Sequence, residues 1–267
     1  MLRSKAFVKV TGKGNVVKVV REHYLRDDIP CGIKGCPGCQ EIQQAPCTVL
    51  LDPIEGSQSA HSQFPDDHPR LIIPDTNILL HHLDVLETDK FQDIVILQTV
   101  LEEVRNRSPA IYQKIRSFVL RHDKRFYVFS NEHHRETYAA EAVSGESIND
   151  RNDRAIRLAS SWYSRHLSVL GAPFSSIKVI MLSNDVGNRS KATGEAFEAI
   201  ALKEYCKGLV GNEILLEMLE SGAEMNFDKE EVVYPDEHLS DSQVQALLSA
   251  GKALKGTLHV SSYNHFE

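Results

Sequence analysis

The chain has 267 residues, of which 42% are hydrophobic and 25% are charged, and its formal net charge is −7. This composition is typical of a globular protein with one large core and excludes a disordered chain. No apolar run approaches the roughly 18 residues of a membrane-spanning helix, and the first residues lack the apolar block of a signal peptide. We therefore expect a soluble intracellular protein with no membrane partner.

Charge is unevenly distributed along the chain. Nine acidic residues and one lysine lie between Asn212 and His238, a segment that we interpret as an acidic tether. Lysines and arginines gather in a basic belt between positions 105 and 125. Such a belt beside an acidic pocket suits an enzyme that acts on a polyanion with the help of metal ions.

The N-terminal part predicts a hairpin followed by a metal site. Residues 5–25 alternate between apolar and polar positions around a glycine-containing turn, the pattern of a β-hairpin. Cys31, Cys36 and Cys39 follow, and the close spacing of the last two lets their thiolates reach one tetrahedral zinc ion. The fourth ligand would be Cys47 or a distant histidine. The alternative is a loop with free thiols or a redox pair.

The segment LIIPDTNILLHH, residues 71–82, organises the rest of the chain. Its apolar start predicts a buried strand that a proline ends, and Thr76 or Asn77 would cap the helix that follows. Asp75 then lies just beyond the carboxyl end of a strand, where open α/β sheets bind their ligands. Residues 177–185 repeat the pattern and also end at an aspartate. Two such strands predict one acidic site.

Between and after these two segments, strand and helix patterns alternate. This alternation predicts a mainly parallel, doubly wound sheet, preceded by the small hairpin and the Cys-rich loop. The polar, breaker-rich residues 53–70 predict a linker between the two parts. Further strands are predicted at 94–97, 125–130 and 197–201, and helices at 109–122, 149–170 and 203–209.

Two more acids fall near helix starts. Thr99 and Glu102 match a capping box, which would give Glu102 a structural role and leave Glu103 free to point elsewhere. Asp153 lies in the first turn of the 149–170 helix, at the edge of its buried face. The ordinary role of an isolated acid there is to cap the helix and to offset its dipole.

The predicted catalytic and metal-binding set is Asp75, Glu103, Asp153 and Asp185. Gathered carboxylates repel one another, so a cluster implies divalent cations, and Mg²⁺ or Mn²⁺ prefers such oxygen ligands. Two ions would support the hydrolysis of a phosphodiester. The chain has no GxGxxG loop or nucleophilic serine motif, so we expect no nucleotide cofactor. Thr76 and Asn77 are expected to orient Asp75, and Asn184 is expected to support the acidic site in the same way.

Four motifs resemble those of PIN-domain nucleases: PDTN at 74–77, QTVLEEVRNRS at 98–108, NDRNDRAIR at 149–157 and SND at 183–185. Through residues 20–30, 131–138 and 256–267 the chain is also similar to the N-terminal regions of the catalytic subunits of eukaryotic RNA exosomes. In those proteins the remaining domains form an RNase II-like exoribonuclease. The chain shows no RNase II-like segment, so we expect no 3′-to-5′ exonuclease activity from it.

The resemblance implies a PIN-like three-layer α/β/α sandwich that acts as a manganese-dependent endonuclease on single-stranded RNA. Its acidic set matches the four carboxylates named above, and not the neighbouring Glu102 or Asp150. The implied domains are an N-terminal hairpin, Cys-rich motif and linker at 1–69, the nuclease domain at 70–210, and an acidic linker with the start of a cold-shock-like barrel at 211–267.

The resemblance also implies partners and a place of action. The cysteine trio is associated with docking onto the exosome core, and the protein would act in the nucleus, including the nucleolus, and in the cytoplasm. By its own spacing His166 is a core histidine, but the resemblance makes it the fourth zinc ligand, with Cys47 as the competitor. Contacts with RNA are assigned to Arg105, Arg107, Arg151 and Arg154.

Two alternatives belong to other functional classes. The chain could be a docking module for the exosome whose nuclease site is idle. It could instead be an acidic-site phosphohydrolase that acts on small phosphate esters, but no DxD pair follows the first strand of the nuclease region.

Overall fold

The computed structural model describes residues 2–10, 16–39, 50–58, 68–121, 124–140, 145–193, 195 and 197–223. Cys47 and the predicted start of a barrel lie outside these residues. In the N-terminal part, strands β1 (Leu2–Val10) and β2 (Val16–Tyr24) pair with each other in a sheet of their own, as the sequence predicts. In the described part of the chain, no helix is both long and apolar enough to cross a membrane.

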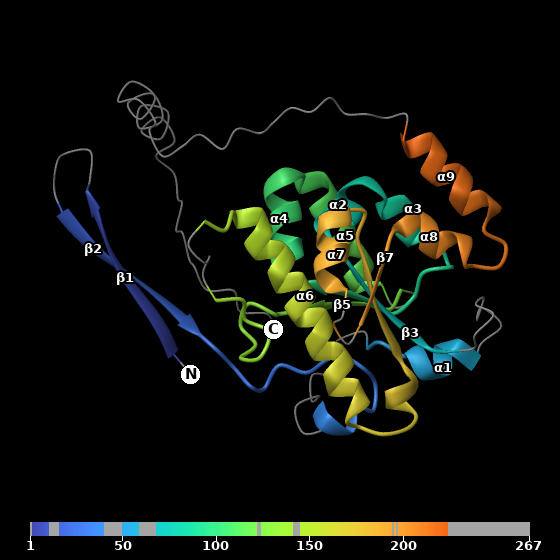
Figure 1. Ribbon diagram of the computed structural model, residues 1–267, viewed down its shortest axis with the longest axis horizontal. Helices are drawn as coiled ribbons and strands as arrows, with labels where there is room; N and C mark the ends of the chain where they lie inside the picture. Colours follow the sequence, from blue (N-terminus) through green and yellow to red (C-terminus); the bar gives the residue numbers. More distant parts are fainter. Residues whose placement is uncertain are drawn as a thin grey trace. The chain divides into compact units, whose positions relative to one another are not determined.

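A parallel sheet forms the centre of the larger compact unit (Figure 1). Within the described residues it has five strands in the order β5-β4-β3-β6-β7, and every pairing is parallel. Strand β3 is apolar on both faces because helices cover the sheet on either side, which explains its unbroken apolar sequence. The strands are β3 (Arg70–Pro74), β4 (Ile94–Leu97), β5 (Phe126–Phe129), β6 (Lys178–Leu182) and β7 (Glu198–Ile200).

The order of the strands reverses between β3 and β6. From β3 the chain continues outward through β4 and β5, and then returns to place β6 on the other side of β3. The two central strands are in register, with Pro74 opposite Leu182. Open α/β sheets bind their ligands outside the carboxyl ends of the strands at such a reversal, so this edge is where a site is expected.

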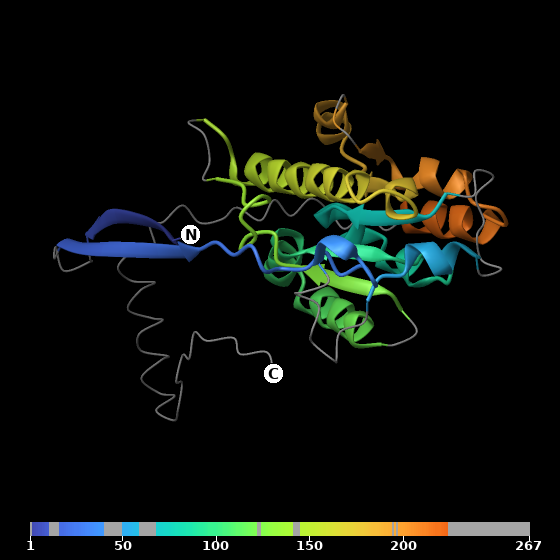
Figure 2. The ribbon, with the colours of Figure 1, turned by 90° about the horizontal axis from the view of Figure 1, so that it is seen from below.

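Helices cover both faces of the sheet. Figure 2 shows the long helix α6 on one face and α5 on the other, which makes three layers and confirms the predicted α/β/α sandwich. Two short 3₁₀ helices, η1 (Pro37–Cys39) and η2 (Phe174–Ser176), complete the described part. The α-helices are α1 (Pro53–Gln58), α2 (Thr76–His81), α3 (Leu83–Glu87), α4 (Gln98–Arg107), α5 (Pro109–Leu120), α6 (Ile148–Ser168), α7 (Val186–Ala192), α8 (Leu202–Lys207) and α9 (Glu213–Ala223).

Some helix starts differ from the sequence predictions. The predicted capping box is wrong, because α4 already begins at Gln98 and the Thr99 hydroxyl donates to the Glu132 carboxylate at 2.6 Å. Helix α6 begins at Ile148, with the Ser147 hydroxyl as its cap. The Thr99 side chain thus bonds to a residue that is distant in sequence, and the cap of α6 is a residue that precedes the predicted start of the helix.

The compact unit extends beyond the nuclease boundaries that the sequence suggests. In addition to residues near the N-terminus, it includes the described residues from Glu22 to Ala223, and therefore the Cys-rich segment. The start of the expected acidic tether instead forms α9, because Leu215 and Leu219 are spaced to lie on one helix face and are buried in the core. Helix α1 lies within the expected linker and contacts β3.

Candidate functional site

Asp75 and Asp185 follow the two central strands of the sheet. The Asp75 backbone N–H donates to the Leu182 carbonyl at 2.9 Å, which continues the pairing of β3 with β6 past the end of β3. The Asp75 residue is only 3% exposed, whereas Asp185 is exposed. The sheet therefore brings one buried and one accessible carboxylate to the edge where the order of its strands reverses.

Both aspartates cap the helices that follow them. Oδ1 of each accepts the backbone N–H of the residue three positions later, at 2.8 Å in both cases. The prediction that Thr76 or Asn77 caps the first of these helices is therefore wrong. Asp75 itself has the extended backbone of an N-cap, and the capping bond holds one of its carboxylate oxygens in a fixed direction.

Glu103 reaches the same edge from helix α4. Its Oε2 accepts a hydrogen bond from the Thr76 hydroxyl at 2.9 Å and another from the Asn152 amide at 3.2 Å. Its Oε1 lies 3.6 Å from the Arg107 guanidinium. Because Thr76 belongs to α2 and Asn152 to α6, this carboxylate ties three helices together. Thr76 thus orients Glu103, whereas we expected it to orient Asp75.

Asp153 completes the group from the second turn of α6. Its Oδ1 accepts a hydrogen bond from the Asn188 side-chain amide at 3.1 Å. Burial, together with repulsion from the other three carboxylates, raises the pKa of Asp153 to about 6. The four acids therefore form one electrostatically coupled set, which we call the carboxylate cluster (Asp75, Glu103, Asp153 and Asp185).

The chemistry of the carboxylate cluster fits divalent cations. Burial raises the pKa of Asp75, and repulsion from Asp185 raises it further against the opposing effect of a hydrogen bond with Ser183. A cation would remove this repulsion, and the donors are the hard oxygens that Mg²⁺ and Mn²⁺ prefer. The four acids are thus the residues that would hold such ions.

The two neighbouring acids have partners outside the cluster. Glu102 is exposed and accepts a hydrogen bond from Gln98 at 2.8 Å. Asp150 bonds to Ser147 at 2.7 Å and to Lys191 at 3.2 Å, and these contacts hold its pKa below the usual range. Both are therefore surface acids with hydrogen-bond partners of their own, and their exclusion from the site stays a prediction.

Polar residues around the cluster have distinct partners. The Asn77 side chain accepts a hydrogen bond from Arg107 at 3.4 Å, while its backbone N–H bonds to Asp75. The Asn184 side chain accepts one from the Leu202 backbone at 3.2 Å. Sequence reasoning missed Ser183, which bonds to Asp75, and Asn188. The signal for Asn188 was its position three residues after Asp185, where a helix that begins at Asp185 returns to the same side.

The four arginines assigned to RNA fall into two groups. Arg151 forms a bidentate ion pair with Glu132, with N–O distances of 2.6 and 2.8 Å. Arg154 forms another with Glu146, with N–O distances of 2.7 and 2.8 Å. Both therefore stabilise the loop before α6. Arg105 and Arg107 are exposed in the last turn of α4, and Arg107 borders the cluster. Contact with RNA stays a prediction for all four.

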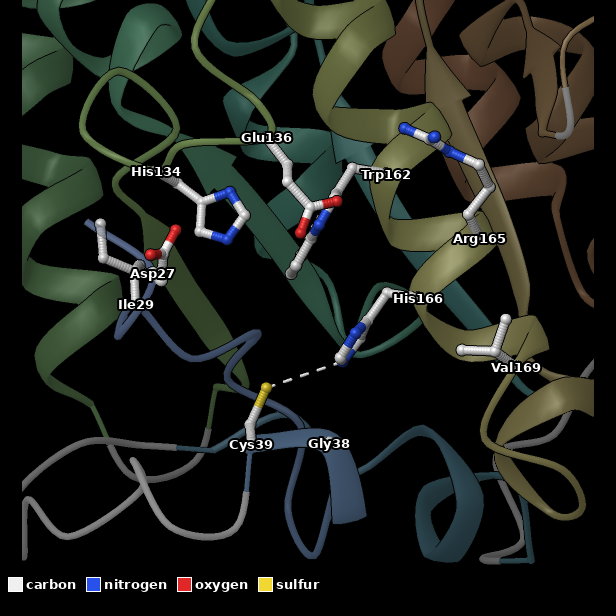
Figure 3. A pocket seen from close by; sticks show the side chains of 10 residues that line it. All are labelled: Asp27, Ile29, Gly38, Cys39, His134, Glu136, Trp162, Arg165, His166 and Val169. Carbon is white, nitrogen blue, oxygen red and sulfur yellow. Dashed lines mark hydrogen bonds between the residues drawn. The ribbon is translucent and has the colours of Figure 1, made fainter. Parts of the chain in front are cut away.

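A second cluster joins the N-terminal loop to the far end of α6. The ligand atoms of Cys31, Cys36, Cys39 and His166 all lie within 4.8 Å of one another. His166 Nε2 is 3.3 Å from Cys36 Sγ and 3.6 Å from Cys39 Sγ, and Figure 3 shows the second contact as a dashed line. Tetrahedral zinc with its usual bond lengths requires separations of roughly 3.5–3.8 Å. This donor set therefore fits zinc, and we call it the Cys₃His cluster.

Hydrogen bonds and close packing shape the loop that carries the cysteines. The Tyr163 hydroxyl donates to the Cys31 carbonyl at 2.8 Å. Gly32 has φ +81°, and a Cβ there would lie 2.5 Å from the Tyr127 ring, so only glycine fits. A Cβ on Gly38 would lie 2.9 Å from the His166 ring. Burial alone would lower the pKa of His166, but hydrogen bonds to the thiols raise it to about 9.

A pocket of about 350 Å³ adjoins the Cys₃His cluster (Figure 3). Trp162 is stacked on His166 with 4.8 Å between the ring centroids, and His134 meets the edge of Trp162 at 4.6 Å. Asp27 and Glu136 add carboxylates to the lining. Since Asp153 and His166 are both on α6, their Cα atoms are about 20 Å apart along its axis. The pocket and the carboxylate cluster are therefore separate sites.

Comparison with known proteins identifies similar chains. The PIN domain family profile matches residues 72–203. "Exosome complex exonuclease RRP44" of Homo sapiens is 44% identical over 271 residues, and "Exosome complex exonuclease dis3" of Schizosaccharomyces pombe is 38% identical over 273 residues. These alignments cover 100% and 99% of this chain but only 27% of each relative. The chain thus spans about a quarter of the length of the curated relatives that it matches.

A solved structure supports the fold. The structure of the T. brucei RRP44 PIN domain superimposes with a TM-score of 0.55 at 28% sequence identity. The match covers 75% of this chain and 96% of that one. The parallel sheet with helices on both faces is therefore the PIN fold.

Proposed function

Since this chain belongs to the PIN domain family and corresponds to the N-terminal PIN region of the RRP44/Dis3 exosome subunits, we propose that it is a metal-dependent endonuclease that cleaves single-stranded RNA. The observation that carries the proposal is the carboxylate cluster, in which burial and repulsion from the other three acids raise the pKa of Asp153 to about 6. Carboxylates held together against their repulsion are expected where divalent cations act.

The protein's own residues hold the site in place. The capping bonds fix Oδ1 of Asp75 and Asp185, and the Thr76 and Asn152 bonds fix Oε2 of Glu103. When bound, Mn²⁺ or Mg²⁺ ions supply an activated water and offset the charge of the phosphodiester. Arg107 lies at the rim with its side chain 38% exposed, where it would bind an adjacent phosphate of the RNA.

A circular single-stranded RNA tests this function, because exonucleases cannot start on a molecule without ends. We expect the chain to linearise the circle in Mn²⁺, and expect EDTA, Asp75→Asn and Asp185→Asn each to abolish cleavage. The matched control is Asp150→Asn, which makes the same change at an exposed acid of α6 that bonds to Ser147 and Lys191.

Two outcomes would contradict the proposal. Cleavage by Asp75→Asn at the rate of the parent would refute the site assignment. An intact circle with a folded, Mn²⁺-loaded parent chain would refute the nuclease, and the docking function below would then become the leading one.

A second candidate function is docking onto the exosome core. It is favoured by the Cys₃His cluster and the pocket beside it, both of which are far from the carboxylate cluster. The two named relatives are exosome complex proteins, which suggests core subunits as the partners. We expect Cys36→Ser to lose exosome subunits in a pull-down while Asp75→Asn retains them. Unchanged capture by Cys36→Ser would exclude this role.

The proposed function also implies a location. Exosome association would place the chain in the nucleus, including the nucleolus, and in the cytoplasm. Fluorescence microscopy of a tagged chain tests this, and exclusion from the nucleus would contradict it.

A further inference from the structure

Asn188 lies between two of the four cluster acids. It belongs to the first turn of α7 and is 2% exposed, although its side chain is polar. Its side-chain Nδ2 donates to Asp153 Oδ1 at 3.1 Å, and its backbone N–H donates to Asp185 Oδ1 at 2.8 Å. A single residue thus contacts one carboxylate from α6 and one from the end of β6.

Arg157 determines the direction of the Asn188 amide. The guanidinium has only N–H donors, so the oxygen of the Asn188 side chain must face it, and the structure has Arg157 donating to that oxygen at 2.5 Å. The NH₂ group of the amide must then face Asp153. The Arg157 side chain is 12% exposed and also lies 4.0 Å from Glu195, which limits its movement.

The neutral amide suits a position beside metal-binding carboxylates. A lysine there would supply a positive charge that competes with a cation, and an aspartate would add a further negative charge. An amide donor fixes one oxygen of Asp153 and leaves the charge of the carboxylate available. The backbone bond to Asp185 is an ordinary capping bond that most residues could make, so the side-chain bond is what distinguishes asparagine.

We propose that Asn188 is a positioning residue, oriented by Arg157, that fixes Asp153 relative to Asp185 so that both can bind the same metal ions. The inference rests on the proposed nuclease function. Partners of this kind hold metal-binding side chains in place without touching the ion, and their loss weakens metal affinity by about 10- to 100-fold.

The test compares Asn188→Ala with the parent in the full chain. Free Mn²⁺ is followed by electron paramagnetic resonance during a titration, and cleavage of circular RNA is measured against Mn²⁺ concentration. We expect Asn188→Ala to bind Mn²⁺ about 10- to 100-fold more weakly and to regain cleavage at high Mn²⁺. A purely structural role would instead reduce the number of binding sites, through loss of folded protein, and leave the affinity of each site unchanged.

Two further variants serve as checks on the result with Asn188→Ala. Arg157→Gln retains Asn188 but replaces the donor-only guanidinium with an amide that can donate or accept, so the direction of the Asn188 amide is no longer fixed. We therefore expect a smaller loss of Mn²⁺ affinity in the same direction. Ser190→Ala changes an exposed residue on the same helix and should match the parent. If Asn188→Ala fails to fold, Arg157→Gln alone carries the test.

The outcomes separate the inference from the proposed function. Mn²⁺ affinity within twofold of the parent in both Asn188→Ala and Arg157→Gln would overturn the role of Asn188, even if the parent cleaves RNA. A parent that binds Mn²⁺ but does not cleave would overturn the nuclease, while weaker Mn²⁺ binding by Asn188→Ala would still support the positioning role. A parent that binds no Mn²⁺ would overturn both.

Discussion

The two clusters at the ends of α6 differ in how the chain builds them. The carboxylate cluster consists of hard, charged oxygens gathered from α4, α6 and the ends of two neighbouring strands, so its geometry depends on the whole sheet. The Cys₃His cluster consists of three soft sulfurs from one short loop and a single distant histidine. The acids of the carboxylate cluster repel one another, which suits a site where divalent cations act. The Cys₃His cluster fits a metal ion that fastens a loop to the domain.

The largest effect is expected from breaking the Cys₃His cluster. Cys36→Ser should remove bound zinc and lower the Tm by roughly 10 °C, because losing a structural metal costs several kcal/mol and each is worth about 2–4 °C in a domain of this size. Metal analysis and a thermal melt check this.

The matched control for this change is Cys206→Ser, because Cys206 is also a buried free thiol but lies outside the cluster. We expect it to retain the zinc. Less than half an equivalent of zinc in the parent chain would refute the assignment of the metal.

The next effect distinguishes the two clusters. Removing a charge from the carboxylate cluster should stabilise the fold, whereas breaking the Cys₃His cluster should destabilise it. Asp153→Asn should abolish RNA cleavage but raise the Tm by a few degrees at pH 7.5 without divalent metal, because burial and repulsion disfavour the charged carboxylate. Melting curves of the two proteins measure the change. A lower Tm for the variant would show that the acids do not strain the domain.

A pair of glycine substitutions tests how the loop of the Cys₃His cluster is held. Gly32→Ala should destabilise the domain by about 2–4 kcal/mol, because it combines a positive φ with a clash against the Tyr127 ring. Gly35→Ala also has a positive φ but meets no atom within 4 Å, so it should cost only about 1 kcal/mol. Urea unfolding compares the two. Equal losses would mean that the ring yields to the added methyl group.

The smallest effect is the pH dependence of the metal-free carboxylate cluster. The pKa of Asp153 in the folded state, about 6, is above its unfolded value, so the folded state binds more protons between the two values. Stability from this group is therefore gained as the pH falls through 6 and lost as the pH rises. His82 and His134, whose pKa values burial lowers, act in the opposite direction.

The difference in Tm between the parent and Asp153→Asn isolates this contribution. It should be largest near pH 8 and shrink toward pH 5, because the protonated aspartic acid and asparagine are both neutral. A difference that does not change with pH would exclude the titration of Asp153 as its cause.

The sequence by itself predicted the main strands of the sheet and the acids and cysteines that gather in two clusters. Apolar runs ending at Asp75 and Asp185 predicted two buried parallel strands with acids at one edge, because strand periodicity and breakers act over a few residues. The spacing of the cysteines likewise predicted a metal loop. These signals are local, so no knowledge of the fold was needed to find them.

Tertiary structure decided the partners. His166 joins cysteines that lie some 130 positions earlier, and Arg151 turns to Glu132, because each contact depends on how α6 packs against the sheet. The same packing places Asn188 between Asp153 and Asp185. Such contacts are set by the requirement that buried polar groups find partners across the whole fold, which local sequence patterns do not encode.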